Sequence, residues 1–222
     1  MMRISGFIIS WLLLLPALCN ASDTIRYPIN EMEGIRIGID LSKPLFPVIY
    51  KDYRIGFEAT ADMHLKGNLF ATAEAGWLYV NLKREKFHYW ENGMYGKIGV
   101  DYNLLKSKIP FSNDIVYGGA RYAMSVFSHQ ADKVTVPGHF WPDATGYSIP
   151  KNTMHAHWLE ILFGLKGELL KNLYAGMTFR FKFMIVKPKD SYSTPYQIPG
   201  FGNGDSGFSL GINYYLSYNI HF

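Results

Sequence analysis

The sequence contains little cysteine, little charge and almost no long apolar stretch. Among its 222 residues there is one Cys, and 18% of the residues are charged, whereas 48% are apolar and 16% aromatic. One cysteine excludes a disulfide-stabilised scaffold, and the high apolar content excludes an intrinsically disordered chain. Because the only long apolar run lies at the N-terminus, a membrane protein built from helices is excluded as well.

Two classes of protein are compatible with this composition. A soluble, aromatic-rich β-sandwich and a membrane β-barrel with a polar interior can both average to the observed mean hydropathy of −0.04. The distribution of apolar residues along the chain therefore has to decide between them.

The N-terminal apolar run has the organisation of a secretory signal. Arg3 supplies the positive start, and the stretch from Phe7 to Leu18 is too short to cross a hydrocarbon core of about 30 Å. Cys19 and Ala21 place small residues where a signal peptidase requires them for cleavage after Ala21. We therefore expect residues 1–21 to be removed.

A lipoprotein signal, in which Cys19 is acylated, is the alternative. Leu18 stands where such a signal has a small residue, so cleavage after Ala21 is favoured. The mature chain, residues 22–222, would then be a single domain without cysteine, carrying 21 basic and 18 acidic residues. This weak positive bias is spread along the chain and argues against a nucleic-acid partner.

Alternation of apolar and polar residues is the strongest pattern in the mature chain. Residues 53–65 place Ile55 and Phe57 on one face of an extended strand, and Arg54 and Glu58 on the other. The same alternation occurs in eight segments: 35–41, 53–65, 69–79, 94–104, 116–127, 157–169, 173–186 and 208–222.

Strand length and connection length both favour a membrane barrel. Most of the segments reach the roughly 9–11 residues of a tilted transmembrane strand, whereas strands of soluble proteins average about 5–6. Tight turns at 66–68 and 171–172, and a somewhat longer joint at 106–114, alternate with long loops at 42–52, 82–92, 128–155 and 187–207. We predict an all-β, eight-stranded, antiparallel up-and-down transmembrane β-barrel.

In such a barrel the apolar faces contact lipid and the polar faces line the interior. The polar faces carry seven cations and seven anions, and a narrow interior must pair its charges. A packed plug of ion pairs is favoured over a lining for a narrow ion path. The predicted interior charges are Arg36, Asp40, Arg54, Glu58, Asp62, Glu74, Lys97, Asp101, Arg121, Glu160, Lys166, Glu168, Arg180 and Lys182.

Aromatic residues gather near the predicted strand ends, as in the interfacial girdles of membrane barrels. These residues are Trp77, Tyr79, Tyr102, Phe208, Tyr218 and Phe222. The chain ends with Tyr218, Ile220 and Phe222 at every second position. A terminal Phe after such an alternation resembles the C-terminal assembly signal of bacterial outer-membrane proteins.

The whole mature chain resembles small outer-membrane barrels of the OmpA/OmpX type. Segments such as Gly99-Val-Asp-Tyr-Asn, Ala156-His-Trp-Leu-Glu and Ile198-Pro-Gly-Phe-Gly are more closely similar to an uncharacterised outer-membrane family (a domain of unknown function) of Bacteroidetes. The resemblance implies a Gram-negative outer membrane, outer-membrane lipid as the surroundings, and a last strand read by the barrel-assembly machinery. The family carries no established activity to transfer.

Three groups of residues could carry chemistry or binding. His155 and His157 share a strand face, with His129, His139 and His88 as further histidines, but ordinary hydrogen bonding is favoured over a metal site. Ser125, Ser128, His129 and Glu160 supply the residue types of a lipid-modifying hydrolase, without geometry to support one. The aromatic loop residues either bind a partner or glycan or pack the loops together: Phe140, Trp141, Tyr147, Tyr192, Tyr196 and Phe201.

The glycine-rich segment 200–207 lacks the Gly-Lys-Ser/Thr ending of a phosphate-binding loop and is read as an outer loop. We predict an integral outer-membrane protein with a structural or interaction role, not an enzyme, without cofactor or metal. Another envelope protein or a glycan at the outer loops is the candidate partner. A lipid-modifying enzyme and a narrow channel are the alternatives.

Overall fold

A computed structural model describes residues 34–44, 54–84, 87–105, 114–136, 144–188 and 194–221, with the side chains of 135, 136, 144, 145 and 147 left out. These residues belong to one compact unit, 32–106 and 113–222. The predicted signal at 1–21 and the terminal Phe222 lie outside the described residues. No helix in the described ranges is long and apolar enough to cross a membrane.

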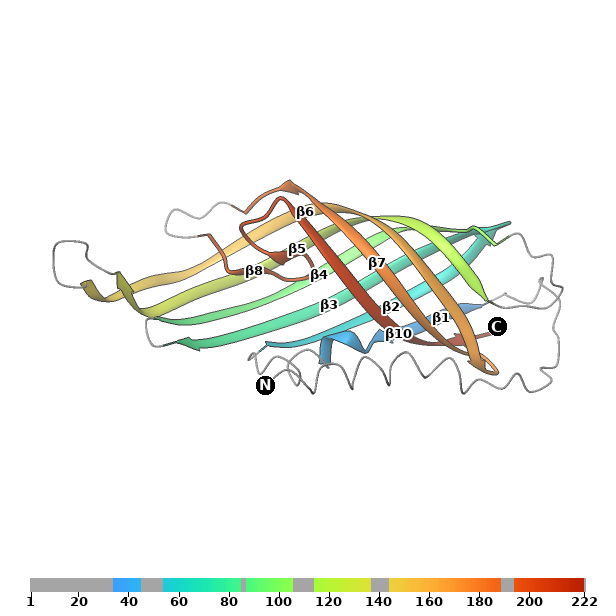
Figure 1. Ribbon diagram of the computed structural model, residues 1–222, viewed down its shortest axis with the longest axis horizontal. Coiled ribbons are helices and arrows are strands. Elements are labelled where there is room, and N and C mark those ends of the chain that lie inside the picture. The colour runs from blue at the N-terminus through green and yellow to red at the C-terminus, as the bar shows by residue number, and fades with distance from the viewer. Residues whose placement is uncertain are drawn as a thin grey trace, which may run out of the picture. The chain divides into compact units, whose positions relative to one another are not determined.

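Eight antiparallel strands close into a barrel, which confirms the predicted fold (Figure 1). Around the ring the order is β1-β10-β7-β6-β5-β4-β3-β2, so every strand lies beside its neighbour in sequence and the first pairs with the last. The ring strands are β1 (Ile35–Asp40), β2 (Arg54–Lys66), β3 (Leu69–Arg84), β4 (Phe87–Asn103), β5 (Ile115–Val136), β6 (Ala144–Leu170), β7 (Leu173–Val186) and β10 (Phe208–Ile220). Two short strands, β8 (Gln197–Ile198) and β9 (Gly202–Asn203), form a separate small hairpin.

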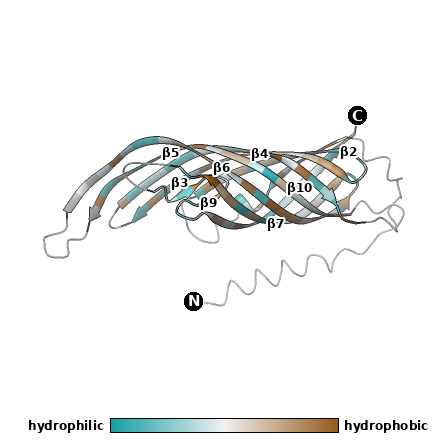
Figure 2. Cartoon of the chain, turned by 90° about the horizontal axis from the view of Figure 1, so that it is seen from above, coloured by the Kyte–Doolittle hydropathy of each residue, from teal (hydrophilic) through white to brown (hydrophobic). Residues whose placement is uncertain are grey.

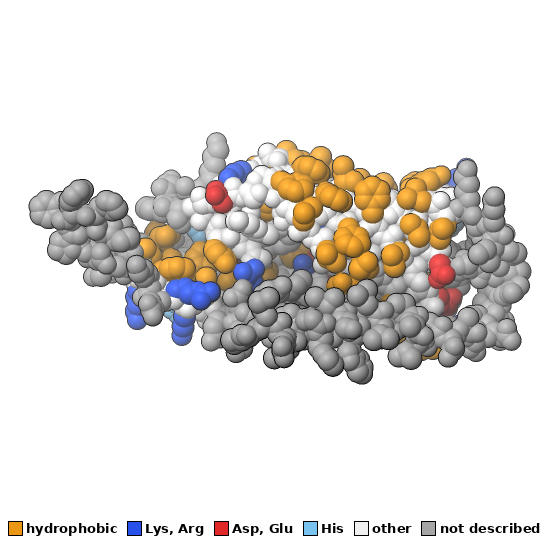
Figure 3. All heavy atoms as spheres, viewed as in Figure 1, with side chains coloured by type: hydrophobic (Ala, Val, Ile, Leu, Met, Phe, Trp, Pro, Cys, Tyr) orange, Lys and Arg blue, Asp and Glu red, His pale blue; other side chains and the backbone are white. Residues whose placement is uncertain are grey.

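The two walls of the barrel have opposite chemistry. Large apolar side chains of the alternating segments point outward, such as those of Met94, which is 68% exposed, and Ile55, which is 59% exposed. Figure 2 shows hydrophilic and hydrophobic residues alternating along the strands, and Figure 3 shows orange side chains gathered over the middle of one face. Charged residues of the same strands point inward and are buried. A soluble sandwich would have the reverse arrangement.

Four strands are longer than the sequence pattern predicted. The expected loop at 82–92 is mostly strand, because β3 runs to Arg84 and β4 begins at Phe87; likewise β5 and β6 extend through most of the expected loop at 128–155. From Leu78 onward the chemistry of the inward face changes: the same face of β3 that carries Thr72 and Glu74 now carries the buried apolar residues Leu78, Val80 and Leu82. We define the tall wall as the part of β3–β6 that extends past the level of Leu78. It projects beyond the other strands at one end (Figure 1).

The tight turns lie at the other end of the barrel. Gly67, between β2 and β3, has φ of 61°, and Asn172, between β6 and β7, has φ of 67°. Glycine has no Cβ to oppose this left-handed conformation, and asparagine is among the few other residues that adopt it readily. The backbone N–H of Asn172 also donates to Glu168 Oε1 over 2.8 Å.

Candidate functional site

The centre of the barrel holds a network of ion pairs built on Glu74. This carboxylate, on the inward face of β3, lies 2.9 Å from Lys97 Nζ, 2.7 Å from Arg180 Nη2 and 3.3 Å from Arg121 Nε. All four side chains are almost fully buried. One carboxylate therefore joins three cations that come from β4, β5 and β7.

Two further carboxylates complete the network. Glu58 accepts hydrogen bonds from the hydroxyl groups of Tyr95 and Tyr215 and from Lys97 Nζ. Glu160 accepts from Arg180 Nη1 over 2.6 Å and from the indole N–H of Trp158 over 2.8 Å. Tyrosine and tryptophan thus donate hydrogen bonds to the carboxylates where the cations do not. A buried carboxylate requires such partners for its oxygens.

A second group of charges lies nearer the tight turns. Asp62 joins Arg36 and Lys166, each over 2.6 Å. On the neighbouring strands, Asp101 accepts from Arg121 Nη2 over 2.7 Å and from Thr72 Oγ1 over 3.0 Å. These contacts link β2 to β1 and β6, and β4 to β3 and β5.

The structure buries twelve of the fourteen predicted interior charges inside the barrel: Arg36, Asp40, Glu58, Asp62, Glu74, Lys97, Asp101, Arg121, Glu160, Lys166, Arg180 and Lys182. The other two, Arg54 and Glu168, lie toward strand ends and are half-buried. Arg54 begins β2 and donates to the hydroxyl of Tyr196 over 3.4 Å.

Glycine on the inward face makes room for tyrosine from the next strand. Gly76 on β3 is paired with Tyr95 on β4, whose ring lies across it, and a Cβ at Gly76 would overlap that ring. Gly164 and Tyr117 repeat the arrangement between β6 and β5. The ring positions let Tyr95 reach Glu58 and let Tyr117 reach Thr178 Oγ1 over 2.9 Å.

The segment after β7 folds into the tall-wall end of the barrel. Ile198 and Phe201 are fully buried in an apolar cluster with Tyr95, Phe127 and Trp158. Of the two alternatives for Phe201, the structure supports packing and not exposure to a partner, because the closed ring provides an apolar chamber that excludes it from water. Tyr196 is exposed, whereas Phe140, Trp141 and Tyr192 lie outside the described residues, as does the side chain of Tyr147.

A buried polar cluster that the sequence did not suggest lies beside this segment. Tyr89 donates its hydroxyl hydrogen to Glu91 Oε2 over 2.6 Å, and His129 Nδ1 lies 3.3 Å from the same hydroxyl oxygen. Burial raises the pKa of Glu91 to about 7 and also raises the pKa of Tyr89. The available signal was strand parity: Tyr89 and Glu91 share the face of Lys97 on β4, and His129 shares the face of Arg121 on β5.

The residue types of a hydrolase are not brought together. Ser125 points inward and donates to the carbonyl of Met94, whereas Ser128 lies on the opposite face of β5. Glu160 pairs with Arg121 in the strand register, four positions from Ser125, and its carboxylate is held by Arg180.

The histidines likewise form no metal cluster in the part of the chain that the structure describes. His155 and His157 lie on the outward face of β6 with ring centroids 6.0 Å apart, and His157 Nδ1 lies 2.8 Å from the hydroxyl of Tyr122. His88 lies against Trp90 with the two rings tilted by 36°, and His129 is buried. His139 lies outside the described residues.

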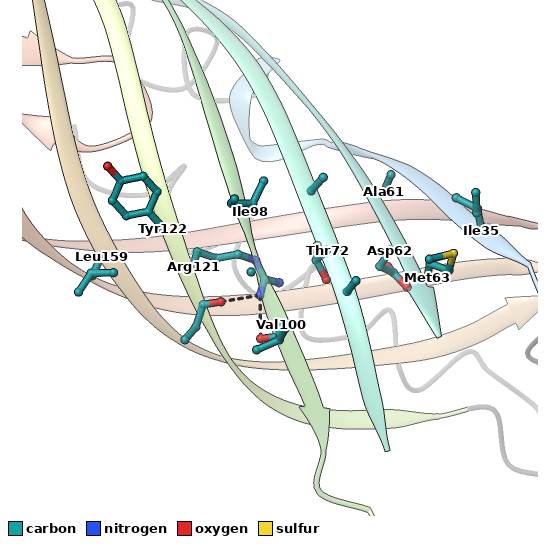
Figure 4. Close-up of a pocket in the computed structure, with 14 residues that line it drawn as sticks. Ile35, Ala61, Asp62, Met63, Thr72, Ile98, Val100, Arg121, Tyr122 and Leu159 are labelled. Carbon is teal, nitrogen blue, oxygen red and sulfur yellow. Dashed lines mark hydrogen bonds between the residues drawn. The ribbon is translucent and has the colours of Figure 1, made fainter. Parts of the chain in front are cut away.

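A shallow groove of about 740 Å³ lies on the outward wall (Figure 4). It exists because alanines at 61, 71, 73 and 120 lie between longer side chains such as Ile98 and Leu159. Arg121, at its base, donates to the carbonyl groups of Val100 and Ala120. The outward side chains of the groove are apolar and offer no catalytic group.

An apolar outer wall, a closed ring and an ion-paired interior define this chain as a small eight-stranded β-barrel of the kind that places its polar side inward. Residues 3–222 match the family described as "Domain of unknown function (DUF6048)", and the chain belongs to that family. No curated protein matches the sequence.

Two solved structures are similar to this chain. A major outer membrane protein from Thermus thermophilus is 10% identical, with a TM-score of 0.48 over 84% of this chain and 98% of that one. CarO2 from Acinetobacter baumannii is also 10% identical, with a TM-score of 0.46 over 84% of this chain and 97% of the other.

Proposed function

We propose that this protein is an integral outer-membrane barrel with a closed interior and a structural or interaction role. One observation carries the proposal: the apolar side chains face outward around the ring while the ion pairs face inward. Leaving so many large apolar side chains in water would be unfavourable, whereas lipid accepts them. A closed barrel also leaves no unpaired strand edge in the hydrocarbon.

The exposed apolar band supports a spanning position. On β4 it runs from Met94 to Tyr102, and on β5 from Val116 to Val126, which is the length of a tilted transmembrane strand. Tyr102, Tyr218 and Phe208 are exposed near strand ends, where aromatic residues favour the membrane interface. We place the tight turns in the periplasm and the tall wall outside the cell, following the usual asymmetry of such barrels.

A membrane barrel of this kind should resist mild extraction and denaturation. We expect the protein to stay with membranes in alkaline carbonate, and to migrate faster on a gel before boiling than after, because the closed ring persists in detergent until heated. A protein that washes off in carbonate and migrates identically with and without boiling would contradict the spanning position.

The packed interior supports a closed barrel and not a channel. The side chains of Glu74, Lys97, Arg121 and Arg180 contact one another across the centre, and eight strands leave an interior just wide enough for side chains. We therefore expect no ohmic conductance steps when the purified protein is inserted into a planar bilayer. Regular steps that scale with salt concentration would contradict a closed interior and favour the narrow channel.

The remaining assignments follow from this setting and are also proposals. Residues 1–21 serve as the cleaved signal, and the last strand serves as the assembly signal: Tyr218 and Ile220 are exposed on the outward face of β10. The tall wall, which stands beyond the apolar band, offers the surface for another envelope protein or a glycan. Outer-membrane lipid surrounds the band itself.

A further inference from the structure

The segment from Tyr196 to Phe201 closes the outer end of the barrel and is held there on two sides. On one side, Lys182 Nζ donates to the carbonyl oxygen of Gly200 over 2.7 Å and to that of Phe201 over 3.2 Å. The ring of Phe201 packs edge-on against Trp158, with centroids 5.7 Å apart. Removal of this segment would uncover an apolar chamber with aromatic walls.

On the other side, the segment is held by Tyr89 and Glu91 of the tall wall. The backbone N–H of Tyr196 donates to the Tyr89 hydroxyl oxygen over 3.1 Å, and the backbone of Gln197 lies near enough to Glu91 to lower the pKa of its carboxyl group. Arg54 of β2 lies over the Tyr196 ring, 5.6 Å from its centroid. The start of the segment is therefore held against one tyrosine–glutamate pair, in which the Tyr89 hydroxyl joins Tyr196 to Glu91.

Glu91 is an unusual partner because half of its carboxyl group has none. The residue is 1% exposed, and its Oε1 is buried without a hydrogen-bond partner among the described residues. The groups that face it are Tyr89 on its own strand, His129 on β5, Arg54 on β2 and the Tyr196–Gln197 backbone. Since Tyr89 gives its hydrogen to Glu91, the 3.3 Å contact between His129 and Tyr89 has Nδ1–H as donor.

A proton on Glu91 removes the charge that this buried and half-unpaired carboxyl group would otherwise carry. Glu91 lies three residues beyond Met94, outside the exposed apolar band, so it can exchange protons with water when the segment moves. Burial raises its pKa to about 7, although the Tyr89 hydroxyl, the Gln197 backbone and Arg54 act in the opposite direction. In water a glutamate titrates near about 4.3, so the closed arrangement binds the proton more tightly than the open one.

We propose that residues 196–201 are a lid over the apolar chamber, and that loss of the proton from Glu91 releases this lid. The sign follows from linkage: a carboxyl group whose pKa is raised in the closed state favours closure at low pH. Closure is then strongest near about pH 4 and weakens as the pH rises to about 7, above which it changes little. The lid goes beyond the proposed function, because the ion pairs beneath it keep the barrel closed in either state.

Labelling of a cysteine at position 198 tests the lid directly. In the full chain carrying Ile198→Cys, in mild detergent, we would measure the rate of reaction with a membrane-impermeant maleimide at about pH 5.5 and about pH 8. Thr194→Cys, exposed just before the lid, corrects for the pH dependence of the thiol itself, and the parent chain, whose single Cys19 is removed with residues 1–21, gives the background. The corrected rate should rise by about tenfold between the lower and the higher pH.

The variant Glu91→Gln should keep the corrected rate low at both pH values, because the amide cannot ionise. Glu168→Gln, at the opposite end of the barrel, is the matched control and should leave the rise intact. Heat-modified migration shows whether each variant has folded, and Glu91→Leu serves if the glutamine variant does not. A corrected rate that is equal at both pH values when Glu91 is present, or that still rises without its carboxyl group, overturns the proposal.

Discussion

Replacing Glu74 with alanine is expected to lower the free energy of unfolding by about 3 to 5 kcal/mol. Glu74 contacts Lys97, Arg121 and Arg180, all buried, and the substitution leaves these three cations with fewer anions and no access to water. Breaking a buried pair costs more than the pair contributes, because the remaining charge is neither solvated nor compensated. Denaturant unfolding of the barrel in lipid vesicles measures the change.

The control for this substitution is Asp205→Ala. Asp205 pairs with Lys187 over 3.6 Å, but both side chains are largely exposed. Water screens such a pair, so its loss should change the free energy of unfolding by less than about 1 kcal/mol. Equal effects of the two substitutions would show that the interior network is not desolvated, and hence that water fills the lumen.

Replacing Gly76 with valine is expected to destabilise the barrel by about 3 kcal/mol, at the upper end for inserting atoms into a packed core. The new side chain would overlap the ring of Tyr95, which lies across Gly76 and donates its hydroxyl hydrogen to Glu58. Displacing the ring also takes this donor from a carboxylate that is fully buried. The yield of heat-modifiable protein and the denaturant midpoint both report the loss.

Two companion variants make the glycine experiment specific. Gly207→Ala adds a methyl group where no atom lies within 4 Å and should be close to neutral. The double variant Gly76→Val with Tyr95→Ala should be more stable than the sum of the single effects, because the overlap exists only when both side chains are present. Additive losses in the double variant would mean that the ring does not occupy the space above Gly76.

The barrel architecture could be predicted from sequence because alternation is a local property. Side chains of a strand point to opposite faces at every second residue, so segments such as 53–65 and 173–186 reveal an apolar wall and a polar wall without knowledge of their neighbours. Strand lengths and the alternation of turns and loops then distinguish a barrel from a sandwich. The interior placement of most charged residues follows from the same pattern.

The tall wall is harder to predict from the sequence, because there the apolar residues lie on the inward face of the strands and not on the outward face. Beyond the apolar band the outward face of the tall wall meets water and the inward face packs against the lid, so Leu78, Val80 and Leu82 turn inward. A reading that equates apolar with outward ends the strands too early. It also misses the contact of His129 with Tyr89 and Glu91, because these residues become a cluster only where both strands continue.

Within the apolar band, the sequence by itself determined which residues face inward, since backbone geometry assigns faces locally. Only the tertiary structure decided which of them meet: Arg180 reaches Glu74 across 106 positions of sequence, and Lys166 reaches Asp62 across 104. The same closure decided that Ile198 and Phe201 are core and not loop surface. Ring closure brings distant strands to the same interior, and the partner of a buried charge depends on depth and angle around that ring, which no local pattern records.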